Sequence, residues 1–475
     1  MNQTPLKNFL ELTYEELETL NLKARSIKDP VKAEAEHLRF LKSESRVKAV
    51  TVCFSDIEGR LHMLDYNKQF FIDSLDNLTF DGSSIRGFSE LSESDLRLVV
   101  DWLSLTFLPS DIFGPGKVLV FANICGSDLT PYESDFRGRL KGYIDELKAH
   151  QDMEAFMAPE IEGFLIEGID AEQNFDQKVG FSLASTGGYY HSLPLDQLPQ
   201  FIDRTAEAIR AMGFKNEKDH AEVAPSQFEI NFSYTDVVRA CDQILLYKLV
   251  CRQVAEHMGM TATFLPKPRQ NINGSGMHTN LSLAKNGKNI FYDKKGQDGL
   301  SKTGWDFITK VLNRAPELCL LINSSVNSYR RLDPNFEAPN QIKVSANDRG
   351  SMIRIPLANE KTARIEVRSV APDCNPYLAL YALLKTGIED VLPAEDKSDK
   401  RSRLRFLPGT IGDAIRLFKA SDYITDVLGE STKQKYAGWK TEVANRSPRD
   451  LGTLVKDEEI LYHHEVTNQY LWNRF

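Results

Sequence analysis

Acidic residues at alternate positions, together with one histidine, are the residues that could carry chemistry in this sequence. They occur in four segments of alternating polar and apolar residues, "APEIEGF" (158–164), "QFEINF" (227–232), "MHTNLSL" (277–283) and "ARIEVRS" (363–369). Side chains at i and i+2 point to the same side of a β-strand, so each segment is predicted to be a strand with one polar face. Those faces would carry Glu160 with Glu162, Glu229 with Asn231, His278 with Asn280, and Glu366 with Arg364 and Arg368.

Each segment alone would be typical of an edge strand with a solvated polar face. Four of them in one chain favour a shared cavity, to which "HAEVAP" would add Glu222. Carboxylates at such close range repel one another by several kcal/mol even at an effective dielectric constant of roughly 20, so cations are expected among them. Oxygen ligands with one imidazole and no thiolate favour Mg²⁺ or Mn²⁺ over zinc or copper.

The histidine follows a glycine-containing turn, "NGSGMHTN" (273–280), that fits none of the common glycine motifs. A Walker loop needs Lys and then Ser or Thr after its last glycine, a dinucleotide fingerprint needs a third spaced glycine, and a zincin helix needs two histidines four residues apart. A lone histidine is often a core residue, but His278 falls on the polar side of its segment. We therefore expect it to be the nitrogen ligand of a carboxylate site, with glycines that let the backbone approach a substrate.

Arginines are the second concentration of functional residues, and they lie near the last of these segments: Arg330, Arg331, Arg349, Arg354, Arg364 and Arg368. Individually they would be ordinary surface residues. Beside a carboxylate metal site they resemble clamps for a transferring phosphoryl group, because guanidinium groups bind phosphate oxygens in a bidentate manner. Phosphoryl transfer depends mainly on positioning and on charge neutralisation.

The elements that must position these residues follow from local patterns. Residues 1–43 are predicted to contain two helices, one beginning with the capping box of Thr13 and Glu16 and one with Asp29 before Pro30. "VKAVTVCFSDIEGRLHML" (47–64) predicts a hairpin that turns at Gly59 and opens a small β-rich unit ending near Leu129. After Pro131, helical stretches alternate with short strands in which polar and apolar residues alternate, and this indicates an α+β fold.

Composition excludes several classes of protein. The formal net charge of −9 and the isoelectric point near 5.6 argue against a nucleic-acid surface, and apolar runs such as "VLVFA" are too short to span a bilayer. The first residues lack the features of a secretory signal. The six cysteines are scattered without a CxxC pair, which indicates reduced core thiols. We expect a cytoplasmic protein with no nucleic-acid or membrane partner.

Taken in order, these motifs resemble those of the glutamine synthetase family, bacterial class I type. The resemblance runs from about Val47 to Ala379 and rests on "FSDIEGRL", "FDGSSIRGF", "APEIEGF", "TGGYY", "EVAPSQFEINF", "PKPRQNINGSGMH", "VNSYRRL", "FEAPNQIK", "SMIRIP" and "RIEVRSVAPDCNPYLAL". Each motif is weak alone, but their number and order are specific. The segment before Glu44 is an extension that shorter members of the class lack.

The resemblance implies a small β-grasp domain at residues 44–130, after the helical extension at 1–43, and a large catalytic α+β domain at 131–475. A curved antiparallel sheet would form an active-site barrel in this larger domain. The active sites would lie between neighbouring subunits of a dodecamer made of two hexameric rings. The implied reaction joins ammonia to the γ-carboxylate of glutamate through γ-glutamyl phosphate, consuming ATP and giving glutamine, ADP and phosphate.

The resemblance also assigns roles to residues. Two or more Mg²⁺ or Mn²⁺ ions would be bound, one by Glu162, Glu222 and Glu229 and another by Glu160, His278 and Glu366. Glutamate would contact Gly274, His278 and Arg331. Arg349 and Arg368 would act on the phosphoryl group, and Arg349 and Arg354 would bind ATP. Asp81 of the adjacent subunit would deprotonate ammonium in a pocket completed by Ser84, Tyr189 and Glu222, while Glu337 would shield the intermediate.

Three other interpretations remain open. A γ-glutamyl ligase that uses an amine or polyamine would share the metals and the intermediate, although the residues of the ammonium pocket are all present. A non-catalytic structural member of the family would not need to keep six metal-ligand positions, and this chain keeps them all. A two-metal phosphohydrolase would fit the metal chemistry, but it would leave the "DGSS" segment at 81–84 unexplained.

Overall fold

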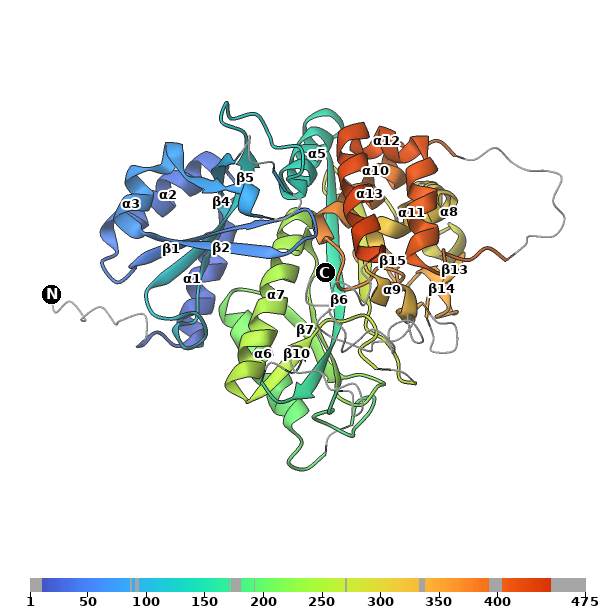
Figure 1. Ribbon diagram of the computed structural model, residues 1–475, viewed down its shortest axis with the longest axis horizontal. Coiled ribbons are helices and arrows are strands. Elements are labelled where there is room, and N and C mark those ends of the chain that lie inside the picture. Colours follow the sequence, from blue (N-terminus) through green and yellow to red (C-terminus); the bar gives the residue numbers. More distant parts are fainter. Residues whose placement is uncertain are drawn as a thin grey trace.

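The computed structural model describes residues 11–85, 88–89, 94–169, 171, 181–191, 193–269, 271–332, 338–392 and 404–445. Figure 1 shows a small mixed sheet at the N-terminal side and a larger part built of a long sheet and many helices. Glu337 lies outside the described residues.

Both helices expected in the first 43 residues are present. Helix α1 (Tyr14–Ser26) begins with the reciprocal capping box of Thr13 and Glu16, and α2 (Pro30–Ser43) begins with Asp29, whose side chain accepts hydrogen bonds from two backbone N–H groups. Both helices pack against strand β4 (Asp95–Phe107). The N-terminal extension is therefore docked on the small sheet.

The small sheet has the strand order β2-β1-β5-β4-β3. Its other strands are β1 (Ala49–Ser55), β2 (Leu61–Asn67), β3 (Thr79–Asp81) and β5 (Lys117–Cys125), with the short helices α3 (Lys68–Asp73) and α4 (Ser110–Phe113) between them. The predicted hairpin is confirmed as β1 paired antiparallel with β2, and Gly59 has a φ of 82° at its turn.

Alternate residues of this sheet belong to two different hydrophobic cores. Val118 and Val120 face a core shared with α1 and α2, whereas Leu119 and Phe121 join the larger core that contains α5 (Phe136–Gln151). Because neighbouring residues of a strand point to opposite faces, one strand serves both cores. The small sheet is thus buried on both sides.

The large sheet contains ten strands within the described part of the chain, and its main path is β13-β14-β15-β11-β6-β8-β7. The pairings are antiparallel except between β13 and β14. The strands are β6 (Met153–Glu167), β7 (Asn216–Ala221), β8 (Gln227–Phe232), β9 (Thr235–Asp236), β10 (Met260–Thr263), β11 (Met277–Lys285), β12 (Lys288–Asn289), β13 (Gln341–Ser345), β14 (Ser351–Arg354) and β15 (Ile365–Val367).

Helices cover the apolar face of this sheet. Met157, Ile161, Phe228, Ile230 and Met277 are all buried in the larger core. The helices are α5, α6 (Gln197–Ala211), α7 (Val237–His257), α8 (Lys302–Ile322), α9 (Val326–Arg331), α10 (Pro376–Glu389), α11 (Ile411–Ala420), α12 (Asp422–Leu428) and α13 (Glu430–Asn445), and α8 with α10 to α13 forms a helical layer on one side in Figure 1. The polar side chains of these strands point away from this core.

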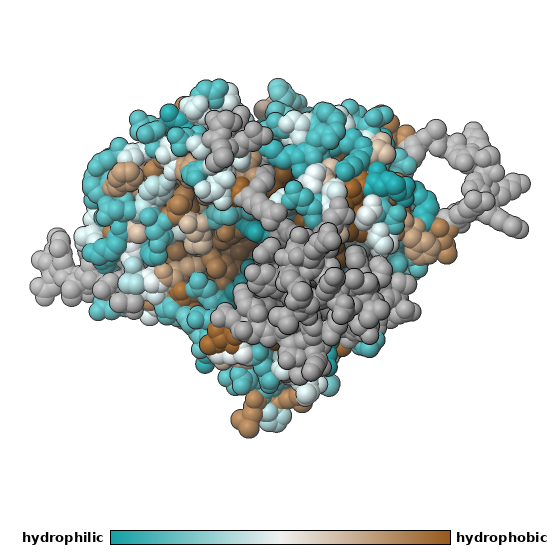
Figure 2. Space-filling view, viewed as in Figure 1, coloured by the Kyte–Doolittle hydropathy of each residue, from teal (hydrophilic) through white to brown (hydrophobic). Residues whose placement is uncertain are grey.

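The surface and the cysteines agree with the expectations from composition. Hydrophilic residues cover most of the described surface in Figure 2, with smaller hydrophobic areas between them. Among the described residues, none of the helices has the length and apolar character needed to cross a membrane. All six cysteines are buried and free of disulfides.

Candidate active site and family

The strands that carry the acidic residues lie next to one another in the large sheet. Strand register places Glu366 of β15 opposite Asn280 of β11, and His278 of β11 opposite Glu160 of β6. On the other side of β6, Glu162 lies opposite Glu229 of β8, which in turn lies opposite His220 of β7. Five strands therefore contribute to one continuous polar face.

A first carboxylate–histidine cluster joins β6, β11 and β15. The Nδ1 atom of His278 lies 3.4 Å from Oε2 of Glu160 and 3.8 Å from Oε1 of Glu366. One ligand atom from each of the three residues lies within 4.8 Å of the others, which is a spacing that could hold a metal ion. Burial alone would raise the pKa of Glu160, but hydrogen bonds from His278 and Asn280 and the charge of His278 lower it to about 2.

A second cluster consists of His220, Glu222 and Glu229, whose ligand atoms also lie within 4.8 Å of one another. Nδ1 of His220 is 3.5 Å from Oε1 of Glu222, and its Nε2 is 3.7 Å from Oε1 of Glu229. His220 was not among the predicted site residues. The signal was its position two residues before Glu222, which places both side chains on the same face of an extended segment.

Glu162 lies between the two clusters. Its Oε1 is 3.9 Å from Nε2 of His278, while its Oε2 accepts hydrogen bonds from the Gly276 N–H at 2.8 Å and from Nε2 of Gln227 at 3.2 Å. The predicted trio of Glu162, Glu222 and Glu229 therefore shares one face, but within the described residues the group at ligand spacing contains His220 in place of Glu162.

Carboxylates in this face are too close to be ionised together without a cation. Burial and the charge of Glu162 raise the pKa of Glu222 to about 7. Burial and the charges of Glu162, Glu160 and Glu222 raise the pKa of Glu229 well above its usual range. Burial also lowers the pKa of His220, so the imidazole supplies little compensating charge at neutral pH.

These clusters line a cavity of about 240 Å³ that also contains arginines. The described residues that line it include the predicted site residues Glu160, Glu162, Tyr189, Glu222, Glu229, Gly274, His278, Arg331, Arg349, Arg354 and Arg368. Glu366 is fully buried beneath the cavity and pairs with Arg354 and, at 2.5 Å, with Arg368. Arg364 instead bonds Asn280 Oδ1 at 3.0 Å and is not a lining residue.

The glycine turn is shaped by Arg331. This buried guanidinium donates to the backbone carbonyls of Arg368 at 2.8 Å and Ser369 at 3.2 Å. A Cβ atom on Gly276 would lie 2.6 Å from Nη2 of Arg331 and 2.8 Å from Nε2 of His278, and one on Gly274 would lie 2.4 Å from a backbone oxygen. Both positions exclude larger residues: the Pro266 carbonyl and the Arg331 side chain confine Gly274, and the Arg331 guanidinium and the His278 ring confine Gly276.

Asp81 and Ser84 are placed away from this cavity. They lie at the end of β3 in the small sheet, where exposed Asp81 accepts hydrogen bonds from the Ser83 N–H at 2.9 Å and from the hydroxyls of Ser83 and Ser84. These bonds lower the pKa of Asp81. Neither residue lines the cavity of its own chain, whereas Tyr189 does, with its hydroxyl 2.8 Å from that of Tyr190.

Comparison with known proteins identifies the family. The family model "Glutamine synthetase, catalytic domain" matches residues 133–450, and "Glutamine synthetase, beta-Grasp domain" matches residues 46–126. The glutamine synthetase of Thermus thermophilus is 37% identical over 418 residues, covering 83% of this chain and 92% of that protein. The glutamine synthetase of Thermotoga maritima is 34% identical over 445 residues, covering 90% and 98%.

A solved structure, that of glutamine synthetase from Plasmodium falciparum, superposes with a TM-score of 0.80 at 20% sequence identity, covering 92% of this chain and 99% of that one. At this identity the match supports the fold alone. The expected α+β fold, with a small N-terminal β-grasp domain and a large catalytic domain, is confirmed. The chain belongs to the glutamine synthetase family.

Proposed function

We infer that this chain is a glutamate–ammonia ligase that converts glutamate, ammonia and ATP into glutamine, ADP and phosphate. Family membership supports the reaction, and the chain is similar to glutamine synthetases of three other organisms. The single structural observation that carries the proposal is the cavity in which two carboxylate–histidine clusters face three arginines, Arg349, Arg354 and Arg368. Carboxylate and imidazole groups bind divalent cations, and arginines bind anionic phosphoryl groups, so a site for both needs these two kinds of residue side by side.

The donor set fits divalent metal ions. Burial and crowded carboxylates raise the pKa values of Glu222 and Glu229, so this face of the protein favours added positive charge. Nε2 of His220 is buried and has no hydrogen-bond partner among the described residues, which leaves a lone pair free for a ligand. Oxygen donors with imidazole and without thiolate suit Mg²⁺ or Mn²⁺.

We assign one ion to Glu160, His278 and Glu366 and another to Glu162, Glu222 and Glu229, with His220 as an additional neighbour of the second. When bound, these ions would neutralise charge on the phosphate oxygens of ATP. Burial and nearby Arg368 lower the pKa of Arg331 to about 10, although Glu162 opposes this change, and Arg331 remains charged at neutral pH. Arg331 is therefore suited to bind the α-carboxylate of glutamate beside Gly274 and His278.

The reaction proceeds in two steps in this assignment. A γ-carboxylate oxygen of glutamate forms a bond to the γ-phosphorus of ATP, and the bond between that phosphorus and the ADP oxygen breaks. Arg349 and Arg368 stabilise the transferring phosphoryl group, and Arg349 and Arg354 hold ATP. The nitrogen of ammonia then attacks the γ-carbonyl carbon, and phosphate leaves with its electron pair, while Glu337 shields the intermediate from water.

Ammonium must lose a proton before it can attack. We assign this step to Asp81, with Ser84, Tyr189 and Glu222 completing the ammonium site. Asp81 is exposed and outside the cavity of its own chain, which fits delivery of this loop to the cavity of an adjacent subunit. A double-ring dodecamer would supply such a neighbour at each site. Six free, buried cysteines fit a reducing cytoplasm.

The deciding experiment measures phosphate release from Mg-ATP in the presence of glutamate, comparing ammonium with a panel of primary amines and polyamines. We expect release with ammonium and glutamine as the product. Preference for an amine would establish the amine ligase instead. A folded oligomer that cleaves no ATP would indicate a structural member, and hydrolysis of phosphate esters without glutamate would indicate a phosphohydrolase.

A further inference from the structure

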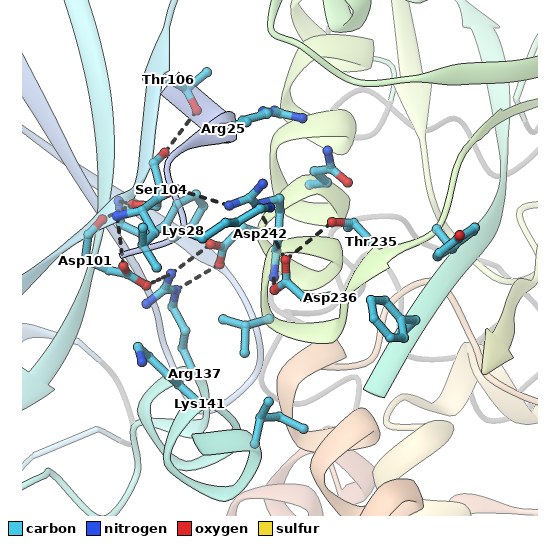
Figure 3. A pocket seen from close by; sticks show the side chains of 18 of the residues that line it. Arg25, Lys28, Asp101, Ser104, Thr106, Arg137, Lys141, Thr235, Asp236 and Asp242 are labelled. Carbon is cyan, nitrogen blue, oxygen red and sulfur yellow. Dashed lines mark hydrogen bonds and ion pairs between the residues drawn. The ribbon is translucent and has the colours of Figure 1, made fainter. Parts of the chain in front are cut away.

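A second, larger cavity lies between the N-terminal extension and the catalytic domain and shares no lining residue with the cavity of the acidic face. Its volume is about 880 Å³, which is within the usual range for sites that bind small molecules. Figure 3 shows Lys28 and Asp242 near the middle of the view, with Arg25 above them and Thr235 and Asp236 to the right. No step of the proposed reaction uses this cavity.

Some charged residues of this cavity neutralise one another. Buried Arg137 pairs with Asp101 at 2.9 Å and with Asp242 at 2.8 Å. Lys141 pairs with Asp145 at 2.6 Å, and Lys148 with Glu154 at 3.6 Å. These ion pairs neutralise the charged residues in the half of the cavity that is formed by α5 and its neighbours.

Positive charge is in excess in the other half, which contains Arg25, Lys28, Lys215 and Arg239. Asp236 lies 3.7 Å from Nε of Arg239 and is the acidic residue of this half. Within the described part of the chain, no carboxylate forms an ion pair with the remaining three cations. Burial and the charge of Arg239 lower the pKa of Arg25 to about 9, and burial with repulsion from Arg239, Lys215 and Arg25 lowers the pKa of Lys28. Asp236 opposes both changes, and Lys28 lies close enough to the other three cations to be repelled by them.

The fold holds Arg25 rigidly in this place. Its guanidinium donates to the carbonyl of Met212 at 2.8 Å and to that of Gly213, and it lies over the ring of Phe214 at 5.4 Å from the centroid. Gly213 has a φ of 79°, and a Cβ atom there would lie 2.9 Å from Asn21. The end of α6 is thus shaped to receive α1 and to present Arg25 at the cavity.

An aromatic residue lies at the opening. Tyr234 is 60% exposed, and its ring meets that of Phe156 edge-on with centroids 5.8 Å apart. Both residues line the cavity. An exposed aromatic face beside unpaired cations can contact the organic portion of an anionic ligand.

We propose that this cavity binds a small phosphate-bearing molecule, with Arg25, Lys28, Lys215 and Arg239 as its cationic ligands. A phosphate group carries up to two negative charges on a compact centre, which matches a cluster of Arg and Lys with few acidic partners. The N-terminal extension supplies two of the four cations and the catalytic domain supplies the others. Binding would tie α1 to the start of α7, so the extension would serve as part of a ligand site. The proposal does not depend on the proposed reaction.

The test is a calorimetric titration of the full-length protein with tripolyphosphate, and with citrate as a carboxylate of similar charge. The main variant is Lys28→Gln with Lys215→Gln, because both lysines are exposed and form no ion pair, so their loss should leave the fold intact. The matched control is Lys23→Gln with Lys42→Gln, which removes two exposed cations of α1 and α2 that do not line the cavity. Any binding to the acidic cavity persists in both variants.

We expect the native protein and the control to bind tripolyphosphate at one site per chain. The affinity of this site for tripolyphosphate should be about tenfold weaker in the main variant. We also expect tripolyphosphate to slow amide hydrogen exchange in residues 14–26 of the native protein and the control only. Equal affinity of the native protein and the main variant for tripolyphosphate would overturn the proposal. Tighter binding of citrate than of tripolyphosphate, lost in the main variant, would overturn the assignment to phosphate.

Discussion

Glu366 and Glu229 are acidic residues of one polar face, but the fold gives them opposite environments. Glu366 is fully buried and pairs with Arg354 and Arg368, so its charge is compensated. Glu229 has other carboxylates as neighbours and one amide donor, Asn231, at 2.7 Å. A buried carboxylate is tolerated when it is paired and is costly when it is not. The stability of the protein should therefore respond differently to loss of each charge.

We predict opposite effects for two matched amide substitutions in the metal-free protein. Glu366→Gln should lower the free energy of unfolding by about 3 kcal/mol, because it leaves two arginines without their carboxylate. Glu229→Gln should raise it by about 1–3 kcal/mol, because it removes a carboxylate that burial and repulsion disfavour. Urea unfolding in EDTA measures both. The interpretation fails if the two substitutions shift the free energy in the same direction.

Metal binding should release protons and should strengthen as the pH rises. In the metal-free protein the pKa of Glu222 is about 7 and that of Glu229 is well above its usual range, so both carry protons at slightly acid pH. A raised carboxyl pKa disfavours the ionised form that a cation needs, so affinity for Mg²⁺ should increase from pH 6 to pH 8. Calorimetry in two buffers of different ionisation enthalpy would count the protons, and we expect about one or more per chain at pH 7.

Affinity that stays constant between pH 6 and pH 8, with no proton release, would contradict this prediction. The Glu222→Gln variant is the specific control. Its affinity for Mg²⁺ should be weaker than that of the native protein, and its dependence on pH near 7 should be shallower. A native-like pH profile in that variant would assign the protons to another group.

At the scale of elements, one buried arginine joins five of them. Arg137 of α5 donates two parallel hydrogen bonds to Asp242 of α7, both 2.8 Å long, and others to Asp101 of β4 at 2.9 Å and Asn123 of β5 at 2.7 Å. Asp242 also accepts the hydroxyl hydrogen of Tyr377 of α10 at 2.6 Å. The small sheet is therefore fastened to the catalytic helices by a fully satisfied polar network.

Arg137→Lys should destabilise the protein by about 3–5 kcal/mol, because a single ammonium group cannot replace the planar fork and leaves buried carboxylate oxygens unpaired. Thermal unfolding measures the effect. The control is Lys141→Ala on the same helix, where loss of an exposed pair with Asp145 should change the free energy of unfolding by at most about 0.5 kcal/mol. A loss of similar size in both variants would show that the network is not what fastens these elements.

The sequence predicted the faces of strands better than their arrangement. Alternation in β6, β8 and β11 correctly separated Ile161, Phe228 and Met277 from the polar residues, since side-chain direction is a local property of a strand. The order β15-β11-β6-β8-β7 depends on pairings between strands that are mostly distant in the sequence, such as that of His278 with Glu160, and no local pattern determines those. The number of strands with a polar face therefore suggests that these faces adjoin, but only the pairing of the strands in the structure shows it.

Two residues show what local patterns miss. His220 lies in β7, where "NEKDHA" has no apolar alternation to indicate a strand, and its burial comes from neighbours in β8 and from the rings of Tyr189 and Tyr190. Arg137 lies in a helix where an arginine is ordinarily solvent-exposed. Its burial depends on Asp101, Asn123 and Asp242, which come from three other elements.

At the scale of the whole molecule, the assigned residues are divided between two sheets. Asp81 and Ser84 lie at the exposed end of β3 in the small sheet, and the other described site residues lie on or beside the large sheet. A single chain does not bring Asp81 into its own cavity. If the assignment of Asp81 to ammonia use is correct, each working site must take this carboxylate from another subunit, and activity should be a property of pairs of chains.

Mixed assemblies of two defective chains test this directly. Asp81→Ala and His278→Ala should each lose ammonia-dependent turnover as pure assemblies, because one lacks the proton acceptor and the other lacks a residue of the cavity. When the two are unfolded together, mixed in equal amounts and refolded, some sites combine an intact Asp81 loop with an intact cavity. Random mixing in a closed ring gives about one quarter of all sites this composition, so we expect about a quarter of native turnover.

The control mixes Glu366→Gln with His278→Ala, two changes in the same cavity. No pairing of these chains produces an intact cavity, so turnover should stay at the level of the pure variants. Recovery of turnover in the control mixture would show that it does not require an intact Asp81 from one chain and an intact cavity from another. Absence of recovery with Asp81→Ala, in assemblies shown by native mass spectrometry to contain both chains, would mean that Asp81 acts within its own chain or has no part in ammonia use.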